Sequence, residues 1–161
     1  MSKSKVKVML IVFFDIRGLV HHEFVPHGTI INAKFYVEVL KRLKQRVYRI
    51  RPDIADDWKL HHDNAPAHTA FLVTCFLTDS KVPMVPQPPY SPDVAPPDFF
   101  LFPHLKTPLK GHHFGTVDKV KEACTKALKD ILEEAYHDAF DAWKSRWKQC
   151  IDAVGAYFEA F

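Results

Sequence analysis

The sequence predicts an α/β fold in which a mixed sheet is flanked by helices and the C-terminal part is helical. The chain opens with runs of β-branched and aromatic residues, continues with short apolar runs that alternate with helical stretches, and ends in helical periodicity alone. With 161 residues, of which 47% are hydrophobic and 25% charged, it is long enough for one domain with a substantial core. We therefore expect residues 1–161 to form a single domain.

The first part of the chain is predicted to form strands. Residues 6–14 and 19–25 are rich in β-branched and aromatic side chains, and the turn at Arg17-Gly18 makes them a hairpin. Residues 29–31 follow a Pro-His-Gly turn and are expected to form a third, short strand. The hairpin is antiparallel, whereas the later strands need crossover connections and should pair in parallel, so the sheet is expected to be mixed.

The middle of the chain alternates helices with short strands. Asn32 is expected to cap a helix that extends to about Tyr48, because apolar side chains recur at helical spacing after it, and Pro52 ends the segment. The other elements predicted here are a strand at 58–62, a helix from Pro66 through Leu77 and a strand at 82–85.

A proline-rich segment precedes the helical part. Residues 87–97 contain five prolines, which exclude a helix or an inner strand and make a stiff, extended loop. Asp98 follows at the start of a predicted helix over 99–106, where the helix N-terminus favours an ionised carboxylate. Apolar stripes within 117–132 and 140–154 predict that the last third is helical.

Charge and cysteine content restrict the function only loosely. The formal net charge of +3 is compatible with a polyanionic partner without requiring one. The three cysteines show no metal-ligand spacing, and we expect them to be reduced core thiols of an intracellular protein. No apolar run is long enough to cross a membrane, so no membrane partner is expected.

Three aspartates mark the predicted ends of separate elements. Asp15 ends the first apolar run, Asp63 lies in the phrase His-His-Asp-Asn-Ala-Pro-Ala-His, and Asp98 closes the proline-rich loop, with 34 residues between the last two. Carboxylates so placed can hold two divalent metal ions, which activate the attacking oxygen and stabilise the leaving oxygen in phosphodiester chemistry. One such aspartate alone is usually a cap or surface residue, so the three with their flanking phrases together indicate a DNA-cutting and DNA-joining site.

Polar residues around Asp63 allow more than one interpretation. A histidine-ligated zinc site is disfavoured, because the adjacent His61 and His62 point to opposite faces of a strand. His68 and Asn64 are candidates for a contact to a metal ligand or to DNA. The alternative for His68 is an ordinary hydrogen bond at the start of a helix.

Basic side chains form two clusters. Each is either a solvated helix face or a sequence-independent, salt-sensitive contact to DNA phosphates. The candidates for DNA contact are Lys41 and Arg42 in the first cluster and Lys106 and Lys110 in the second. The remaining members are Lys44, Arg46, Arg49 and Arg51 in the first cluster and His112 and His113 in the second.

The motifs resemble those of the mariner branch of the Tc1/mariner transposases over nearly the whole chain. The phrase at 62–70 resembles the second-aspartate motif of that family, and the phrase at 88–103 resembles the third, with the family's DD34D spacing. Residues 14–26 resemble the first motif, and 110–114 and 147–158 resemble the C-terminal part. The chain is also similar to the transposase part of the SET-domain methyltransferase–mariner fusion, without any methyltransferase sequence.

The resemblance implies an RNase H-like (retroviral integrase-like) fold and a DDD-type transposase that uses two Mg²⁺ or Mn²⁺ ions. Asp15, Asp63 and Asp98 would be the catalytic residues and the metal ligands. Water would cut DNA at a transposon end, and the freed 3′-hydroxyl would attack target DNA. The expected partners are therefore transposon ends, target DNA and a second copy of the chain in a homodimer, in the nucleus and without a small-molecule cofactor.

Two departures from the family pattern bear on activity. The family's N-terminal helix-turn-helix modules are not in this sequence, so we expect a truncated or remnant copy. Pro97 stands where the family usually has a small residue, and Asp93, five residues before Asp98, is assigned a structural role in the turn. The alternative functions are an inactive remnant that binds DNA weakly or dimerises, and an RNase H-like nuclease or resolvase outside transposition.

Overall fold

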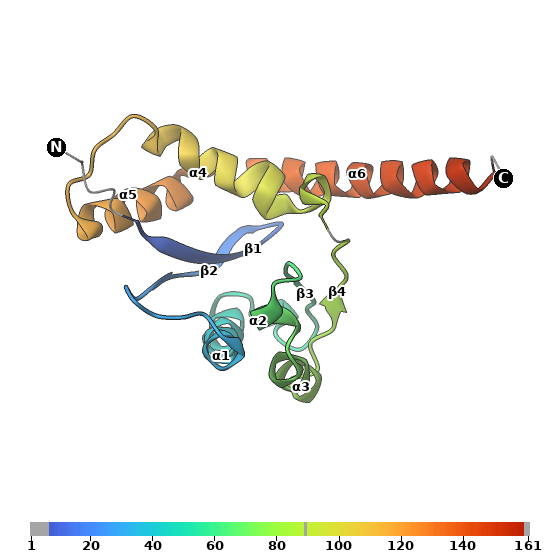
Figure 1. The fold of residues 1–161 in the computed structure, drawn as a ribbon, viewed down its shortest axis with the longest axis horizontal. Coiled ribbons are helices and arrows are strands. Elements are labelled where there is room, and N and C mark those ends of the chain that lie inside the picture. Colours follow the sequence, from blue (N-terminus) through green and yellow to red (C-terminus); the bar gives the residue numbers. More distant parts are fainter. Residues whose placement is uncertain (1–6, 89, 160–161) are drawn as a thin grey trace. The chain divides into compact units, whose positions relative to one another are not determined.

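The computed structural model describes residues 7–88 and 90–159 (Figure 1). The described chain divides into two compact units. The first unit comprises residues 7–14 and 19–88, and the second unit comprises residues 15–18 and 90–159. The first contains most of the strand residues, whereas the second is almost entirely helical.

The chain begins with a two-stranded sheet, as the sequence predicts. β1 (Met9–Asp15) and β2 (Gly18–Val25) are joined by two residues, which allows only an antiparallel hairpin. Gly18 has a φ of +126°, a conformation that favours glycine. The Asp15 side chain accepts hydrogen bonds from the backbone N–H groups of Arg17 and Gly18, so the aspartate itself helps to build the turn.

The prediction of a third strand at 29–31 is wrong. The described residues 26–32 form a turn, in which the N–H of Thr29 donates to the carbonyl of Pro26, followed by an irregular stretch. Ile30 is 81% exposed. A strand requires a neighbouring strand edge and a surface to pack on, and β-branched composition alone supplies neither.

The longest element of the first unit is α1 (Ala33–Ile50). Asn32 caps it, since its side-chain oxygen accepts a hydrogen bond of 2.8 Å from the backbone N–H of Phe35. The helix ends before η1 (Pro52–Ile54), a 3₁₀ turn whose first residue lacks the N–H that helix continuation needs. Both ends agree with the prediction, and the helix continues two residues beyond Tyr48.

The core of the first unit forms on the buried face of α1, where Val39 and Leu40 are almost inaccessible to solvent. The helix predicted from Pro66 to Leu77 is divided into α2 (Pro66–Thr69) and α3 (Phe71–Asp79), because the intervening Ala70 is extended, with a ψ of 150°. Residues of the hairpin, β3, α3 and the segment that follows α3 complete the core. They are Val20, Leu60, Val73, Leu77 and Val82.

The segment that carries Asp63 follows a short pair of parallel strands. β3 (Leu60–His61) pairs with β4 (Met84–Val85), and the parallel pairing agrees with the prediction. The described strands nevertheless form two separate two-stranded sheets, and not the one mixed sheet expected. Two residues in each strand offer too few backbone groups to extend the ladder to the hairpin.

Apart from residues 15–18, the described part of the second unit begins at residue 90 in the proline-rich loop, where the 3₁₀ turn η2 (Pro92–Val94) forms. Asp98 lies in η3 (Pro97–Leu101), a π-helical turn that leads into α4 (Phe102–Leu109). The single α-helix predicted over 99–106 is therefore two helical types in succession. Pro97 occupies the first turn of η3, where a missing N–H is tolerated.

Helices make up the rest of the second unit, as predicted. α5 (Val117–Asp130) is capped by the Thr116 side chain, and α6 (Glu133–Glu159) is the longest element. The rings of Phe100 and Tyr136 meet edge-on with centroids 5.4 Å apart, and both side chains are buried. Other buried side chains here are Val94, Leu101, Leu105 and Leu128. Over the described residues, no helix combines the length and the apolarity that crossing a bilayer requires.

Candidate active site

Asp15 is fixed by the turn that follows it. It is the last residue of β1, and its Oδ1 accepts the N–H of Arg17 at 2.9 Å and the N–H of Gly18 at 3.1 Å. These two bonds hold the carboxylate at the end of the strand, as the sequence predicts for a residue that ends the first apolar run. Position 18 favours glycine because of its φ of +126°, whereas the ring of Tyr136 would lie at an ordinary contact distance of 3.6 Å from an added Cβ.

Asp63 follows β3 and keeps most of its side chain, 69%, in solvent. Its Oδ1 accepts a hydrogen bond of 3.0 Å from the backbone N–H of Ala65, which leads into α2. The Nδ1 atom of His68 lies 2.6 Å from the same oxygen, an ion-pair distance, although its angles are not those of a hydrogen bond. Asp63 is thus held from its own turn and from the helix that follows.

His68 belongs to a stack of three rings. Its imidazole lies parallel to the phenol of Tyr36, with centroids 4.0 Å apart, and to the imidazole of His62, with centroids 5.0 Å apart. The Tyr36 hydroxyl contacts Nδ1 of His62 at 2.8 Å, and Nε2 of His62 contacts the sulfur of Met84 at 2.8 Å. The His68 ring, which contacts Asp63, therefore packs against the Tyr36 ring of α1 and the His62 ring directly after β3.

The buried part of this stack is uncharged at neutral pH. Burial and the neighbouring His68 lower the pKa of His62 to about 4, and burial raises the pKa of Tyr36 well above its usual value. Because a thioether can only accept, the ring hydrogen of His62 is assigned to Nε2, facing Met84. Nδ1 of His62 then accepts from the Tyr36 hydroxyl.

A second set of contacts ties the Asp63 segment to the chain after β4. The Asn64 side chain donates to the backbone carbonyl of Gln87 at 2.7 Å, and Nε2 of His61 lies 2.7 Å from the side-chain oxygen of Gln87. The adjacent His61 and His62 thus reach different partners, as strand geometry predicts. In the structure, Asn64 uses its amide group to hold this segment.

Asp98 is exposed in the first turn of the π-helical segment. Its own N–H and the N–H of Phe99 both donate to the carbonyl of Ala95, at 2.9 and 3.1 Å. π-helical turns are rare and often occur at functional sites. The proline-rich loop predicted from the sequence thus ends in a turn at Asp98 that is closed by hydrogen bonds to the Ala95 carbonyl.

The three aspartates are divided between the two units. Asp63 lies in the first unit, whereas Asp15 and Asp98 lie in the second. Among the side chains that the structure describes, no three histidines, cysteines, aspartates or glutamates gather as a group that could hold a metal ion. The structure gives the local setting of each carboxylate, and the sharing of metal ions among them stays a prediction.

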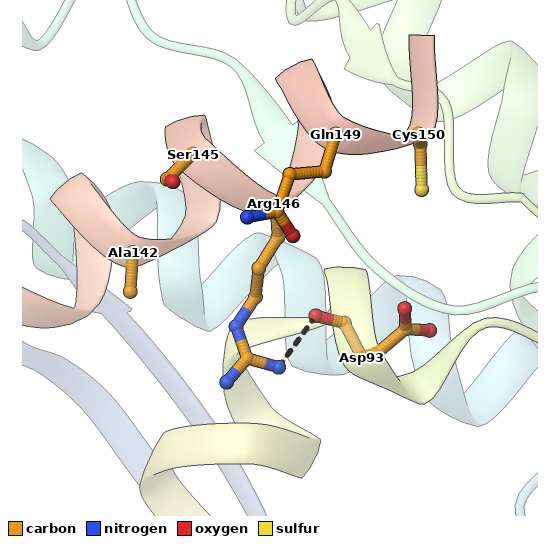
Figure 2. A pocket seen from close by; sticks show the side chains of 6 residues that line it. All are labelled: Asp93, Ala142, Ser145, Arg146, Gln149 and Cys150. Carbon is orange, nitrogen blue, oxygen red and sulfur yellow. Dashed lines mark hydrogen bonds between the residues drawn. The ribbon is translucent and has the colours of Figure 1, made fainter. Parts of the chain in front are cut away.

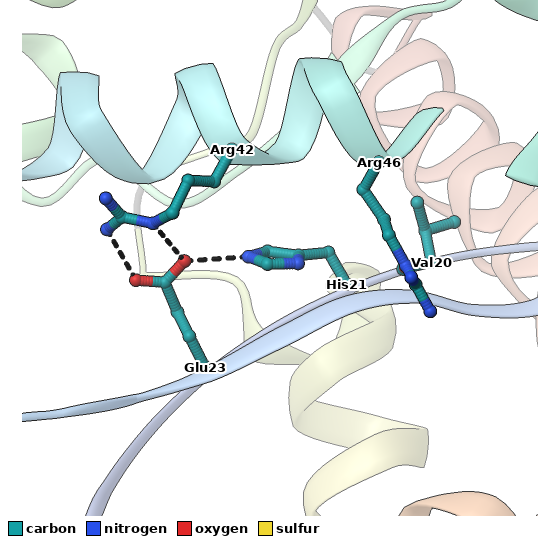
Figure 3. A network of polar contacts seen from close by, with 5 residues as sticks. All are labelled: Val20, His21, Glu23, Arg42 and Arg46. Carbon is teal, nitrogen blue, oxygen red and sulfur yellow. Dashed lines mark hydrogen bonds and ion pairs between the residues drawn. The ribbon is translucent and has the colours of Figure 1, made fainter. Parts of the chain in front are cut away.

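Several basic residues of α1 are engaged within the fold. Arg42 forms a two-pronged ion pair with Glu23 of β2, with N–O distances of 2.7 and 3.0 Å, and His21 contacts the same carboxylate at 2.7 Å (Figure 3). Arg46 donates to the carbonyl of Val20. Lys41 pairs with Glu38. In the second unit, Lys106 and Lys110 are exposed.

Sequence reasoning missed two residues that support the site. In the sequence, Tyr36 is only one of the apolar positions of a helix, whereas in the structure its ring and hydroxyl contact His68 and His62. Arg146 of α6, which contacts the segment around Asp98, was not singled out. The only sequence signal for Tyr36 is weak: it is a tyrosine among the apolar positions of a helix, in a chain that also has a His-rich motif. The signal for Arg146 is equally weak, since it is a single arginine beside a row of aromatic residues.

Comparison with known proteins gives consistent matches. The family model described as "Transposase (partial DDE domain)" matches residues 2–56. The mariner Mos1 transposase of Drosophila mauritiana is 32% identical over 158 residues, which cover 95% of this chain and 45% of that protein. The human histone-lysine N-methyltransferase SETMAR is 28% identical over 155 residues, which cover 95% of this chain and 23% of that protein. The chain thus spans less than half the length of either curated relative.

Solved structures match over most of the chain. The Mos1 transposase catalytic domain, crystallised with raltegravir and Mg, superposes with a TM-score of 0.85 at 30% identity, covering 91% of this chain and 74% of that one. The Mos1 strand transfer complex gives a TM-score of 0.83 at 29% identity, covering 98% of this chain and 47% of that one. The likeness therefore lies in the catalytic domain.

Proposed function

Because this chain belongs to the mariner family of transposases, we propose that it is a catalytic domain that cuts DNA at transposon ends and joins the freed 3′-hydroxyl to target DNA. The chain has the RNase H-like fold of the Mos1 catalytic domain. The observation that carries the proposal is the match to that domain over 91% of this chain, in a structure crystallised with Mg. A strand transfer complex among the similar structures supports DNA as the partner.

We assign metal binding to Asp15, Asp63 and Asp98. The chemistry of this donor set fits the proposal, since carboxylate oxygens are the hard ligands that Mg²⁺ and Mn²⁺ prefer. Two such ions, when bound, supply charge that stabilises the attacking and leaving oxygens of phosphodiester exchange. Each carboxylate stands where the chain ends one element or begins another, the arrangement that the sequence predicts.

The remaining assignments concern groups around these carboxylates. His68 and the turn at Ala65 orient Asp63, and Asn64 fixes the segment that carries it. The exposed Lys106 and Lys110 are suited to sequence-independent phosphate contacts, which would weaken as salt rises. Arg42 is a poorer candidate for DNA contact, because Glu23 already binds its guanidinium group. We expect the protein in the nucleus, where such DNA lies.

The test is nicking of supercoiled plasmid by the purified chain with Mg²⁺ or Mn²⁺. We expect nicking that disappears in Asp15→Ala, Asp63→Ala and Asp98→Ala, and that persists in Asp79→Ala, which removes an exposed acid at the end of α3. Nicking that survives loss of any of the three carboxylates would contradict the site assignment.

The same experiment separates the catalytic proposal from a binding function. A folded protein that fails to nick with either metal, yet retards DNA in a gel at low salt or sediments as a dimer, would be a non-catalytic member of the family. Cleavage of RNA–DNA hybrids or junctions in preference to plasmid would instead indicate a nuclease outside transposition.

A further inference from the structure

Arg146 of α6 contacts two points of the segment that holds Asp98. Its Nη1 donates a hydrogen bond of 3.0 Å to the backbone carbonyl of Asp93, and its guanidinium carbon lies 4.3 Å from the centroid of the Phe99 ring. Figure 2 shows the side chain reaching from α6 to Asp93. Both residues line a cavity of about 480 Å³. All of these residues belong to the second unit.

The two contacts bracket the catalytic candidate. Asp93 lies in η2, and Phe99 directly follows Asp98 in η3. Between them, Val94 and Ala95 are buried, and the Ala95 carbonyl accepts the N–H groups of both Asp98 and Phe99. The segment is thus closed upon itself, and Arg146 holds it at its first residue and at the residue after the aspartate.

Arginine is suited to both contacts at once. The planar guanidinium can lie over an aromatic ring while an N–H in its plane donates to a carbonyl, whereas a lysine ammonium has no flat face to stack. A backbone carbonyl rather than a carboxylate accepts the bond, so the contact depends on the course of the chain at 93 and not on the identity of that side chain.

We infer that Arg146 is a positioning residue for Asp98, which keeps the π-helical turn in the one conformation that presents the carboxylate to a divalent metal ion. The inference rests on the proposed function for the metal and deepens it, because it assigns a residue from α6 to the support of the site. Residues that orient metal ligands typically change metal affinity about 10- to 100-fold when they are replaced.

The test measures Mn²⁺ binding to the full chain by the loss of the free-ion signal in electron paramagnetic resonance, without DNA or turnover. We expect Arg146→Gln to weaken Mn²⁺ binding about 10- to 100-fold and Arg146→Lys to weaken it less, because lysine keeps the charge but loses the stacked plane. Lys148→Gln removes the same charge from an exposed position of the same helix and should bind Mn²⁺ as the wild type does.

Hydrogen exchange of the backbone amides supplies the second readout. In Arg146→Gln, exchange should rise in residues 94–101 and remain unchanged in α1, which would separate local release from global unfolding. Phe99→Leu, which removes only the stacked ring, should give a smaller change in the same amides. If Arg146→Gln unfolds the protein, the same measurements on Phe99→Leu and Arg146→Lys test the inference, and unchanged hydrogen exchange in residues 94–101 in both variants would overturn it.

The outcomes distinguish the two proposals. Wild-type protein that does not bind Mn²⁺ would overturn the proposed function and, with it, the role given to Arg146. If the wild type binds Mn²⁺ and the Arg146→Gln variant binds it equally well, with unchanged hydrogen exchange in residues 94–101, this inference alone is overturned. Weaker binding in Lys148→Gln as well would reduce the effect to general charge and would also overturn it.

Discussion

Asp63 shares one oxygen between a backbone N–H and an imidazole ring. The N–H of Ala65 fixes the oxygen from within the turn, and Nδ1 at the edge of the His68 ring approaches it from α2 while a face of that ring lies against Tyr36. The ring cannot move away without breaking the stack with Tyr36 and His62. At the scale of single residues, the geometry therefore favours an orienting task for His68 at Asp63, which is the contact to a metal ligand that the sequence offers beside a DNA contact and an ordinary helix-start hydrogen bond.

Replacing His68 tests this orienting task. His68→Ala should lower the rate of metal-dependent nicking about 10- to 100-fold, the usual cost of losing a group that orients a metal ligand. The rate would be measured over a range of Mn²⁺ concentrations beside His137→Ala, an exposed histidine paired only with Glu133 on α6 in the contacts described. Equal rates for both variants would remove His68 from the site.

The hydroxyl of Tyr36 can be tested without any activity. Tyr36→Phe leaves Nδ1 of the buried His62 without its donor, which should lower the free energy of unfolding by about 1–3 kcal/mol. Urea denaturation would measure the change. In Tyr48→Phe, the lost hydroxyl contacts Asp56 in solvent, so the matched change should be much smaller. Equal effects of the two variants would contradict the assigned bond.

At the scale of elements, the hairpin and α1 are joined by one polar cluster as well as by the core. Burial raises the pKa of the Glu23 carboxyl, but hydrogen bonds and charge from Arg42 and His21 outweigh it and hold that pKa below its usual value of 4.5. The carboxylate in turn raises the pKa of Arg42. Figure 3 shows the three side chains meeting between β2 and α1.

A carboxyl group whose pKa is lower in the folded state stabilises the fold above its unfolded pKa and loses this contribution as the pH falls. Glu23→Gln should therefore lower the free energy of unfolding at pH 7 by about 1–2 kcal/mol, with the partly exposed Arg42 limiting the value. The difference from wild type should shrink as the pH falls below 4.5. Urea titrations at pH 7 and below 4.5 would measure it, and Glu38→Gln, in an exposed pair with Lys41, should show almost none.

Local signals explain which elements the sequence predicted. The cap at Asn32, the break at Pro52 and the apolar stripe of α1 all lie within one stretch of chain, and the structure confirms them. The strand predicted at 29–31 and the continuous helix through Ala70 failed because pairing and helix direction depend on distant neighbours. The π-helical turn at Asp98 could not be predicted, since two consecutive prolines exclude inner helix positions without specifying the turn that replaces them.

The same limit applies to the site. Its aspartates were visible because each stands in a local phrase, and their roles stay predictions. The ring stack was not visible, because 26 positions separate Tyr36 from His62 in the chain. Arg146 and Asp93 are separated by 53 positions. Contacts of this kind follow from packing, which residue spacing does not encode.

At the scale of the whole molecule, each unit has a buried core that can be disturbed by itself. Leu40 in the first unit and Leu128 in the second are each 1% exposed. Either change to alanine should cost about 2–5 kcal/mol. Native-state hydrogen exchange should show Leu128→Ala raising exchange chiefly in α5 and α6, and Leu40→Ala chiefly in α1 and α3. Equal increases throughout in both variants would mean that the chain opens as one cooperative body.

The turn at 97–101 also decides which deletions a related gene can tolerate. A π-helical turn contains one residue more than the α-helical turn that would replace it. Loss of one codon after Asp98 would leave the spacing from Asp63 intact and would convert the turn to α-helix. Because the narrower turn takes up the lost residue, the residues of α4 would keep their direction, and Leu105 would stay in the core. The same loss inside α4 would rotate every later residue by about 100°, so a one-codon deletion should be tolerated in this turn and not in the helix that follows.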